Sequence, residues 1–344
     1  MLETEMEQKM TYSQNWPAYN EAQIKQKELF MQFLFDLCQD IQEEPRQTGK
    51  GRPRLPIRDV IFSSALKVFT TFSLRRFMTD MRMANRLGYL QTTAHFSMVS
   101  YYMEKEELTP ILKELITLSA MPLQAIETDF AIDSTGFRTT KFNDYCREKH
   151  HVERKHQWVK VHLCCGVKTN IVTAIEVGEE HHSPDSPQFI PLAMQTHESG
   201  FTIREVSADK AYASKNNYNA INEIGGTAYI PFKSNTKIWG SRGRPDIPGS
   251  SQSKGSKSRI WRKMYRYFVY NQEEFLGHYH KRSNIESTNN MIKSKFTDLV
   301  RSKNKTAQIN EVLLKVLCHN ICVLISEMFE SGIEPDFLKG DVVG

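Results

Sequence analysis

The chain has 344 residues, of which 40% are hydrophobic and 25% are charged, and its formal net charge is +5. This is the composition of a globular protein with one large core or two domains. No apolar run is long enough to span a membrane, the acidic start of the chain has no apolar signal core, and the six cysteines form no CxxC pair. We therefore expect a cytoplasmic protein with no membrane partner and no disulfide framework.

The first 120 residues are predicted to contain a polar arm, one helix, a linker and a small helical domain. Residues 1–50 begin with a polar arm, and an amphipathic helix follows from about residue 21 to residue 43. Residues 51–121 begin with a linker rich in Gly and Pro and continue as a small helical domain. Its helices are expected near residues 57–70, 73–87, 93–103 and 108–118, with Ser73 as an N-cap and Gly88 as a C-cap.

The second helix of this domain is rich in arginine. It carries Arg75, Arg76, Arg82 and Arg86. One interpretation is a helix-turn-helix unit that reads DNA. The other is a helical dimerisation module, and the residues favour neither interpretation over the other.

Beyond residue 122 the pattern changes to that of an α/β domain. A short apolar run ends in Asp133 and is followed by Ser-Thr-Gly, which predicts an acid at the end of a strand. An alternating segment at residues 157–163 and a second at residues 171–177 predict an antiparallel hairpin. Asp185 then precedes a helix, where an N-cap is a better interpretation than a metal ligand. A further strand, residues 203–208, delivers Asp209.

Positive charge is concentrated late in the chain. Residues 1–50 hold nine acidic and five basic side chains, whereas residues 231–267 hold ten basic side chains and one acidic side chain. Such a concentration indicates a phosphate-rich partner, although a solvated basic loop is the alternative. Residues 233–258 are rich in Ser, Gly and Lys, so we expect a flexible basic loop there. Within it, Arg242 and Arg244 are candidate DNA contacts.

A third acid lies near residue 286. Residues 280–296 contain no Pro or Gly and are expected to form one helix. Helical spacing places Arg282, Glu286, Asn290 and Lys293 on one face of it. Two strand-borne aspartates and this glutamate could bind hard divalent cations through oxygen ligands. Two such ions would clamp the attacking and leaving oxygens of a phosphodiester.

These residues also carry a family resemblance. Tyr279-x2-Arg282-x3-Glu286-x6-Lys293 resembles the Y-R-E-K signature of bacterial and archaeal insertion-sequence transposases of the DDE class. Asp133-Ser-Thr-Gly and Asp209-Lys-Ala-Tyr resemble the first and second acid motifs of that family. The resemblance covers roughly residues 122–330, with the three acids 76 and 77 residues apart. That interval leaves little room for the long β-rich insertion of the better-known members.

The resemblance implies a fold and a reaction. It implies an α/β fold with an RNase H-like catalytic core, a mixed sheet flanked by helices, over residues 122–332. An all-helical N-terminal domain precedes this core, and residues 333–344 form a tail. Asp133, Asp209 and Glu286 would be catalytic and would hold two Mg²⁺ ions, for which Mn²⁺ can substitute. Tyr279, Arg282 and Lys293 would hold DNA phosphates.

The same resemblance implies the partners, and it leaves rivals open. The partners would be inverted-repeat DNA ends and target DNA, bound by a homodimer or a higher assembly at the nucleoid. The reaction would cut the ends and join them to the target. The rivals are a domesticated, catalytically silent DNA-binding protein and an RNase H-like nuclease without strand transfer. A structural helical protein whose acids are ordinary surface residues is a third alternative.

Overall fold

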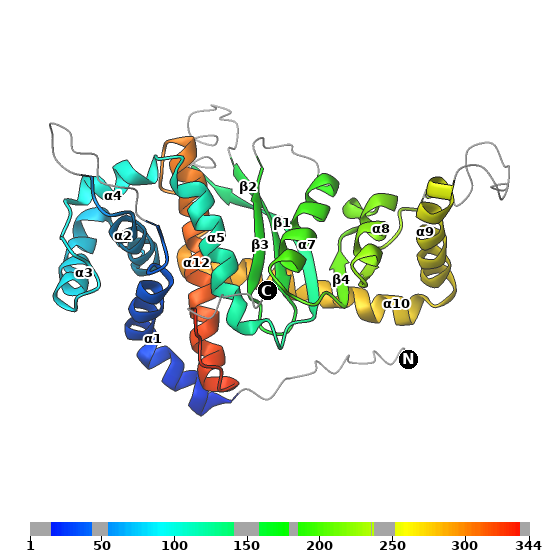
Figure 1. Cartoon of the computed structure of the whole chain (residues 1–344), viewed down its shortest axis with the longest axis horizontal. Coiled ribbons are helices and arrows are strands. Elements are labelled where there is room, and N and C mark those ends of the chain that lie inside the picture. The colour runs from blue at the N-terminus through cyan, green and yellow to red at the C-terminus, as the bar shows by residue number, and fades with distance from the viewer. Residues whose placement is uncertain are drawn as a thin grey trace, which may run out of the picture.

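The computed structural model describes residues 15–42, 54–140, 158–178, 185–234, 236 and 252–337, without the side chains of residues 252–258. Most of the polar arm, the end of the tail, Arg242 and Arg244 lie outside the described residues. Figure 1 shows the described parts as a row of three groups. N-terminal helices lie at one end, a β-sheet lies in the middle, and the helices α8 to α10 lie at the other end.

The centre of the fold is a five-stranded mixed sheet. Its strands are β1 (Asp129–Arg138), β2 (Trp158–Gly166), β3 (Val172–Val177), β4 (Glu205–Ala208) and β5 (Thr227–Tyr229). The order is β3-β2-β1-β4-β5. β1, β2 and β3 pair with one another in antiparallel fashion, whereas β4 and β5 run parallel to β1. This sheet, flanked by helices, confirms the RNase H-like fold and the predicted hairpin.

The prediction that the first strand ends at Asp133 is wrong. β1 continues to Arg138 because β2 pairs with it from Phe130 to Arg138, including Asp133↔Leu163 and Arg138↔Trp158. The parallel pairing of β1 with β4 does end there, at Ile132↔Ala208. Asp133 and Asp209 are therefore the first residues after the last parallel pair, and the two acids share one end of the β1–β4 ladder.

The N-terminal region is helical, as predicted. Its helices are α1 (Trp16–Leu37), α2 (Ile57–Thr70), α3 (Leu74–Arg86), α4 (Phe96–Met103) and α5 (Leu108–Ala120). Ser73 occupies the N-cap position of α3, but its side chain makes no capping hydrogen bond. Gly88 has φ +85°, and its amide donates to the Asn85 carbonyl, so the chain turns sharply after α3.

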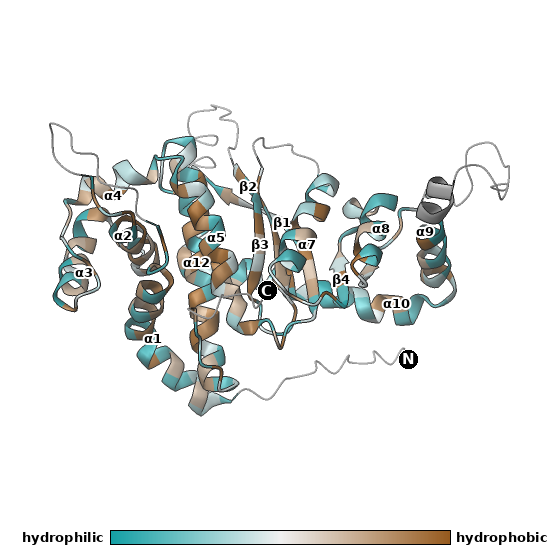
Figure 2. Cartoon of the chain, in the orientation of Figure 1, coloured by the Kyte–Doolittle hydropathy of each residue, from teal (hydrophilic) through white to brown (hydrophobic). Residues whose placement is uncertain are grey.

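The long helix α12 (Lys305–Glu330) joins the N-terminal helices to the sheet. It contacts α1, α2 and α5 as well as β2 and β3. It is also long and apolar enough to cross a membrane, contrary to the expectation that no such run exists, but 78% of its most apolar window is buried. Figure 2 shows this brown helix between the other elements, so α12 is a core helix.

Polar side chains of α12 fix its position. Asn320 is fully buried and holds both backbone groups of Val172 in β3, accepting from the amide at 3.0 Å and donating to the carbonyl at 2.7 Å. It also donates to the Ile116 carbonyl of α5 at 3.2 Å. An unpaired buried backbone group costs about 1–3 kcal/mol, so one side chain keeps α5, α12 and the sheet edge in register.

The remaining helices come after the sheet hairpin in chain order. They are α7 (Phe189–Glu198), α8 (Lys215–Glu223), α9 (Gln252–Tyr270), α10 (Gln272–Tyr279) and α11 (Ser283–Phe296), with a 3₁₀ turn, η4 (His280–Arg282), before α11. Two predictions are wrong here. Residues 252–258, the last part of the flexible loop expected over residues 233–258, form the start of α9, while most of that loop lies outside the described residues. The helix expected over residues 280–296 starts as a 3₁₀ turn.

The aromatic residues of α9 explain why it is ordered. Trp261 is 8% exposed and packs edge-on against Tyr218 and Phe232, at ring-centroid distances of 5.5 and 4.8 Å. Tyr265 also contacts Phe232, at 5.1 Å. Burial of such rings stabilises the helix against α8 and β5. Trp261 and Tyr265 are therefore part of the packing that holds α9 in place.

A buried histidine makes the fold sensitive to acid. His319 on α12 donates from Nε2 to the Asn170 carbonyl at 2.9 Å, and burial lowers its pKa to about 4. The unfolded chain binds this proton near pH 6.5, so the free energy of unfolding should fall as the pH drops from about 6.5 to 4, by up to about 3 kcal/mol. In His319→Gln this part of the pH dependence should disappear, as measured by urea unfolding across that range.

His280→Gln is the matched control, because the His280 side chain is exposed. It should leave the pH dependence as in the wild type. An unchanged slope in His319→Gln would contradict the assignment.

Candidate active site

The two predicted aspartates lie side by side at the end of the parallel ladder. Asp133 is on β1 and accepts from the Ser134 amide at 2.9 Å. Asp209 comes directly after β4 and accepts from the Lys210 amide at 2.7 Å as the N-cap of a 3₁₀ turn. Burial raises the pKa of Asp133, and the neighbouring charge of Asp209 adds to that rise. Both effects show a site where negative charge is costly unless a cation is present.

Arg282 brings the third acid to the first. Its Nη2 donates to Asp133 Oδ2 at 2.9 Å, and its Nη1 donates to Glu286 Oε1 at 2.9 Å. The guanidinium therefore bridges β1 and α11, and it opposes the rise in the pKa of Asp133. Nε of Arg282 is buried and has no hydrogen-bond partner among the described residues. The site thus keeps a spare buried donor beside its carboxylates.

The other two residues of the predicted signature border the same site. Tyr279 ends α10, and burial raises its pKa, with Arg282, Asp209 and Asp133 as its charged neighbours. Lys293 on α11 donates to Thr135 Oγ1 at 2.6 Å, and burial lowers its pKa. Tyr279 and Lys293 therefore lie on either side of the Arg282 bridge along the chain. The signature is one structural unit although it spans two helices and a 3₁₀ turn.

Lys281 is a residue of this site that the sequence analysis missed. Its Nζ donates to Asp129 Oδ2 and to Glu205 Oε2, both at 2.7 Å. Asp129 and Glu205 are paired partners at the start of β1 and β4. Consecutive residues of η4 thus bind opposite ends of one ladder, Lys281 at Asp129 and Arg282 at Asp133. The sequence did contain a signal for this contact. Asp129 and Glu205 each lie four residues before a predicted catalytic acid, Asp133 or Asp209.

A polar cluster beside the two aspartates contains Asp185, and Tyr212 has Asp185, Asp133 and Asp209 as charged neighbours. Asp185 occupies the predicted N-cap position, that of the 3₁₀ turn Ser186–Gln188 before α7, but its side chain makes no capping bond. Its carboxylate instead pairs with Lys160 of β2 at 2.7 Å and lies 3.7 Å from His162 Nδ1. His162 is buried, and its Nδ1 lies 3.3 Å from the Tyr212 hydroxyl. The cluster packs behind the end of β4, because Tyr212 belongs to the 3₁₀ turn that Asp209 caps.

The donor set of the site suits hard divalent cations. Asp133, Asp209 and Glu286 offer carboxylate oxygens, the ligands that Mg²⁺ and Mn²⁺ prefer. Within the described residues no three Asp, Glu, His or Cys side chains are grouped as they would be around a metal ion. The Arg282 guanidinium lies between Asp133 and Glu286 and is ion-paired with both carboxylates. The carboxylate type therefore suits such ions, whereas the arrangement seen here has an arginine between two of the acids.

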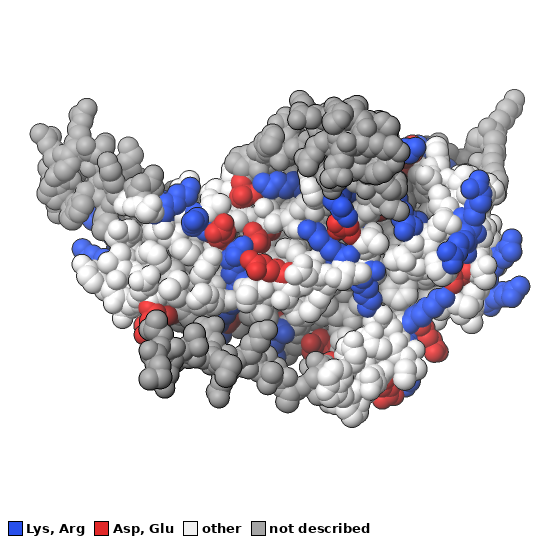
Figure 3. All heavy atoms as spheres, turned by 180° about the vertical axis from the view of Figure 1, so that it is seen from behind, with Lys and Arg blue, Asp and Glu red and all other residues white. Residues whose placement is uncertain are grey.

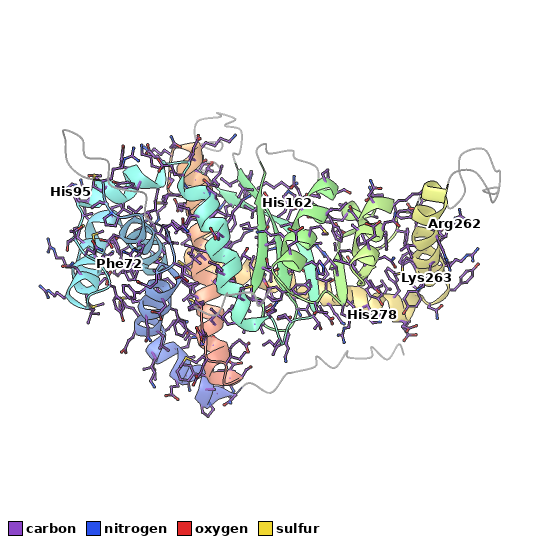
Figure 4. All side chains as sticks on the ribbon, in the orientation of Figure 1. Phe72, His95, His162, Arg262, Lys263 and His278 are labelled. Carbon is purple, nitrogen blue, oxygen red and sulfur yellow. The ribbon has the colours of Figure 1, made fainter. Side chains whose placement is uncertain are left out.

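The structure therefore brings together most of the predicted site. The acids Asp133, Asp209 and Glu286 and the Tyr279 side chain are all electrostatic neighbours of Arg282, and Lys293 binds Thr135, two residues after Asp133. Figure 4 labels His162 near the sheet and His278 on α10. The Nδ1 atom of His278 lies 2.9 Å from Glu205 Oε2, so α10 is also fastened at the start of β4.

Comparison with known proteins gives two results. Residues 125–321, well over half of the chain, match a family model described as "Transposase DDE domain". One solved structure, titled "Cryo-EM structure of piggyBac transposase synaptic complex with hairpin DNA", is similar at 13% sequence identity and a TM-score of 0.43. That similarity covers 89% of this chain and 77% of the other.

Arg282→Gln should tighten binding of Mn²⁺ at the three carboxylates. The guanidinium competes for the same oxygens, so its removal at pH 8 should lower the Kd for Mn²⁺ by about tenfold, or about 1.4 kcal/mol. Isothermal titration calorimetry in the absence of DNA measures this directly. Lys303→Gln, which removes an exposed charge elsewhere, is the control and should bind Mn²⁺ like the wild type. Equal or weaker binding by Arg282→Gln would refute the competition.

Proposed function

The chain belongs to the DDE transposase family, and from this premise we propose that it is the transposase of an insertion sequence, of the bacterial and archaeal Y-R-E-K group. It would cut DNA at the ends of its element and join them to target DNA. The observation that carries the proposal is the Arg282 bridge, which joins the acids of β1 and α11 beside Asp209, the acid that follows β4. Three acids from three elements at one sheet end are difficult to explain as ordinary surface residues.

The residues of the site have separate roles in this proposal. Divalent ions, when bound by Asp133, Asp209 and Glu286, would supply Lewis-acid activation of the attacking and leaving oxygens. Arg282 is suited to a phosphate because its planar fork makes two parallel hydrogen bonds, and its Nε has no partner among the described residues. We assign it to hold a DNA phosphate once it leaves the carboxylates. Tyr279 and Lys293 would contact the neighbouring phosphates.

The catalytic side chains would be positioned by residues that do not themselves react. Lys281 fastens η4 to the first residues of β1 and β4, so the Arg282 and Glu286 side chains start from a fixed point. Correct placement of reactants accounts for a large part of phosphoryl-transfer catalysis. The proposed partners are inverted-repeat ends and target DNA, bound by a homodimer or a higher assembly, because two ends must be joined in one event.

Asp209→Asn and Glu286→Gln should each abolish Mg²⁺-dependent cutting while leaving DNA binding intact. Each change removes one ligand charge and retains the shape, so we expect a loss of about 10²-fold or more in rate. The substrate is duplex DNA carrying the ends of the element that encodes this chain, and gel analysis resolves cut and joined strands. Glu223→Gln on the exposed face of α8 is the matched control.

Three outcomes distinguish the rivals. Retained Mg²⁺-dependent cutting in both variants would remove the acids from catalysis. Cutting by the wild type without joined products would identify a nuclease rather than a transposase. Intact binding without any cutting by the wild type would identify a silent DNA-binding protein.

A further inference from the structure

The geometry of α2, α3 and α4 is that of a DNA-reading unit. Only three residues, 71–73, separate α2 from α3, and Thr71 at the start of this turn is left-handed with φ +56°. The three helices contact one another in every pair. Two helices joined by a turn of three or four residues are the defining feature of a helix-turn-helix, in which the second helix enters the major groove. By this geometry α3 is the second helix.

The exposed face of α3 is basic. Arg75, Thr79, Arg82 and Arg86 are all exposed, and their spacing of four, three and four residues places them in one stripe. The single acid of the helix, Asp80, is on the buried face and pairs with Lys27 at 2.6 Å. The stripe therefore contains no negative charge. Figure 3, seen from behind, shows Lys and Arg side chains (blue) on the surface of the molecule.

Two aromatic rings orient the arginines at the start of α3. The Arg75 guanidinium lies over the Phe96 ring at 4.9 Å from its centroid, and the Arg76 guanidinium lies over Phe72 at 4.7 Å. Phe72 is 38% exposed and lies in the turn before α3 (labelled in Figure 4). A side chain that is already oriented loses less entropy when it binds. The arginine side chains in the first turn of α3 are thus already oriented before a partner binds.

The turn before α3 is tied to the catalytic domain. Arg301, in the segment after α11, donates from Nη1 to the Thr71 carbonyl at 2.9 Å. The ring centroid of Phe69, near the end of α2, lies 6.5 Å from that of Phe296, the last residue of α11. In Figure 1, α3 lies at the outer edge of the molecule, with α2 between it and the rest of the protein. A DNA duplex can therefore approach α3 from outside, while α3 itself keeps a fixed position relative to α11.

We propose that α3 is the recognition helix that reads base sequence in the major groove of terminal-repeat DNA, through Arg75, Thr79, Arg82 and Arg86. This inference rests on the proposed function and names the site that would choose the DNA. Arginine makes two hydrogen bonds to guanine O6 and N7, and the threonine methyl contacts the thymine methyl. Thirteen residues of α3 extend about 20 Å, enough to cross several base pairs.

The charge of the stripe favours DNA over a second copy of the chain. A two-fold contact through this face would place the same arginines opposite each other, and the stripe contains no apolar side chain to offset that repulsion. Phosphates flanking a groove supply the opposite charge. The alternative interpretation, a dimerisation module, therefore becomes an outcome that the experiment can return.

Helix α9 offers a matched control surface. Arg259, Lys263 and Arg266 are exposed on it at spacings of four and three residues, so it carries similar charge in a similar arrangement. Arg262 and Lys263 are labelled in Figure 4 at the end of the molecule opposite the N-terminal helices. Within the described residues α9 is preceded by no short turn from a packed first helix, and we expect its contacts with DNA to be with phosphates only. Phosphate contacts weaken binding to all sequences equally when they are removed.

The experiment selects duplexes from a random pool with the full-length wild-type protein, in buffer containing EDTA so that no cutting occurs. Fluorescence anisotropy at one fixed salt concentration then gives the Kd for the selected duplex and for a shuffled duplex. Arg82→Ala and Arg86→Ala should each weaken binding to the selected duplex by about tenfold and reduce the preference over the shuffled duplex. Lys263→Ala and Arg266→Ala should weaken both duplexes by the same factor.

Each other result overturns the inference. The wild type selecting no motif would show that the chain does not read sequence. An unchanged motif and preference in the α3 variants would place the reader elsewhere. Loss of a dimer in sedimentation, with the preference unchanged, would make α3 a subunit contact.

Equal melting temperatures for all variants establish that these exposed substitutions leave the fold intact.

The same variants separate this inference from the proposed function. If Arg82→Ala loses motif preference but still cuts non-specific DNA with Mn²⁺, the catalytic proposal stands independently of the reader. If the wild type selects a motif through α3 but never cuts DNA, the catalytic proposal fails while this inference holds.

Discussion

The structure depends on one physical constraint, the cost of placing carboxylates together at the end of a sheet. Asp133 and Asp209 are adjacent because β1 and β4 are parallel and in register, and Glu286 is added from α11. Asp133 is half-buried and the charge of Asp209 also raises its pKa, so these two carboxylates repel each other unless a cation lies beside them. Arg282 supplies one cation here, and Lys281 supplies another where the same two strands begin. Two consecutive basic residues therefore hold both ends of the β1–β4 pair.

This arrangement explains why the chain turns as it does before α11. A continuous helix through residues 280–296 would carry Lys281 and Arg282 about 100° apart on one cylinder. The 3₁₀ turn η4 instead directs one side chain to Asp129 and the other to Asp133. The 3₁₀ turn thus coincides with two contacts to acids that lie far away in the sequence. The periodicity of the local sequence does not show such contacts between distant residues.

Local sequence patterns predict the elements that depend on neighbouring residues, and they fail where partners are distant. The hairpin of β2 and β3, the helices α2 to α5 and the three acids are all visible in periodicity and motif spacing. The extension of β1 past Asp133 required knowledge that β2 would pair with it as far as Arg138. The order of α9 required knowledge that Trp261 would find Phe232 and Tyr218. Ser- and Lys-rich composition alone predicted a loop as far as residue 258, which includes the first seven residues of α9.

The same long-range contacts bear on how a reader helix could serve catalysis. Terminal DNA held by α3 reaches the carboxylates only if α3 keeps a fixed position relative to α11. The Arg301 bond to Thr71 and the contact of α12 with α2 both act across that junction. Glu311 of α12 is buried and accepts from the Arg301 amide at 3.0 Å, so the segment that holds the turn is itself held by the core. Sequence choice and chemistry would thus be coupled through one rigid connection.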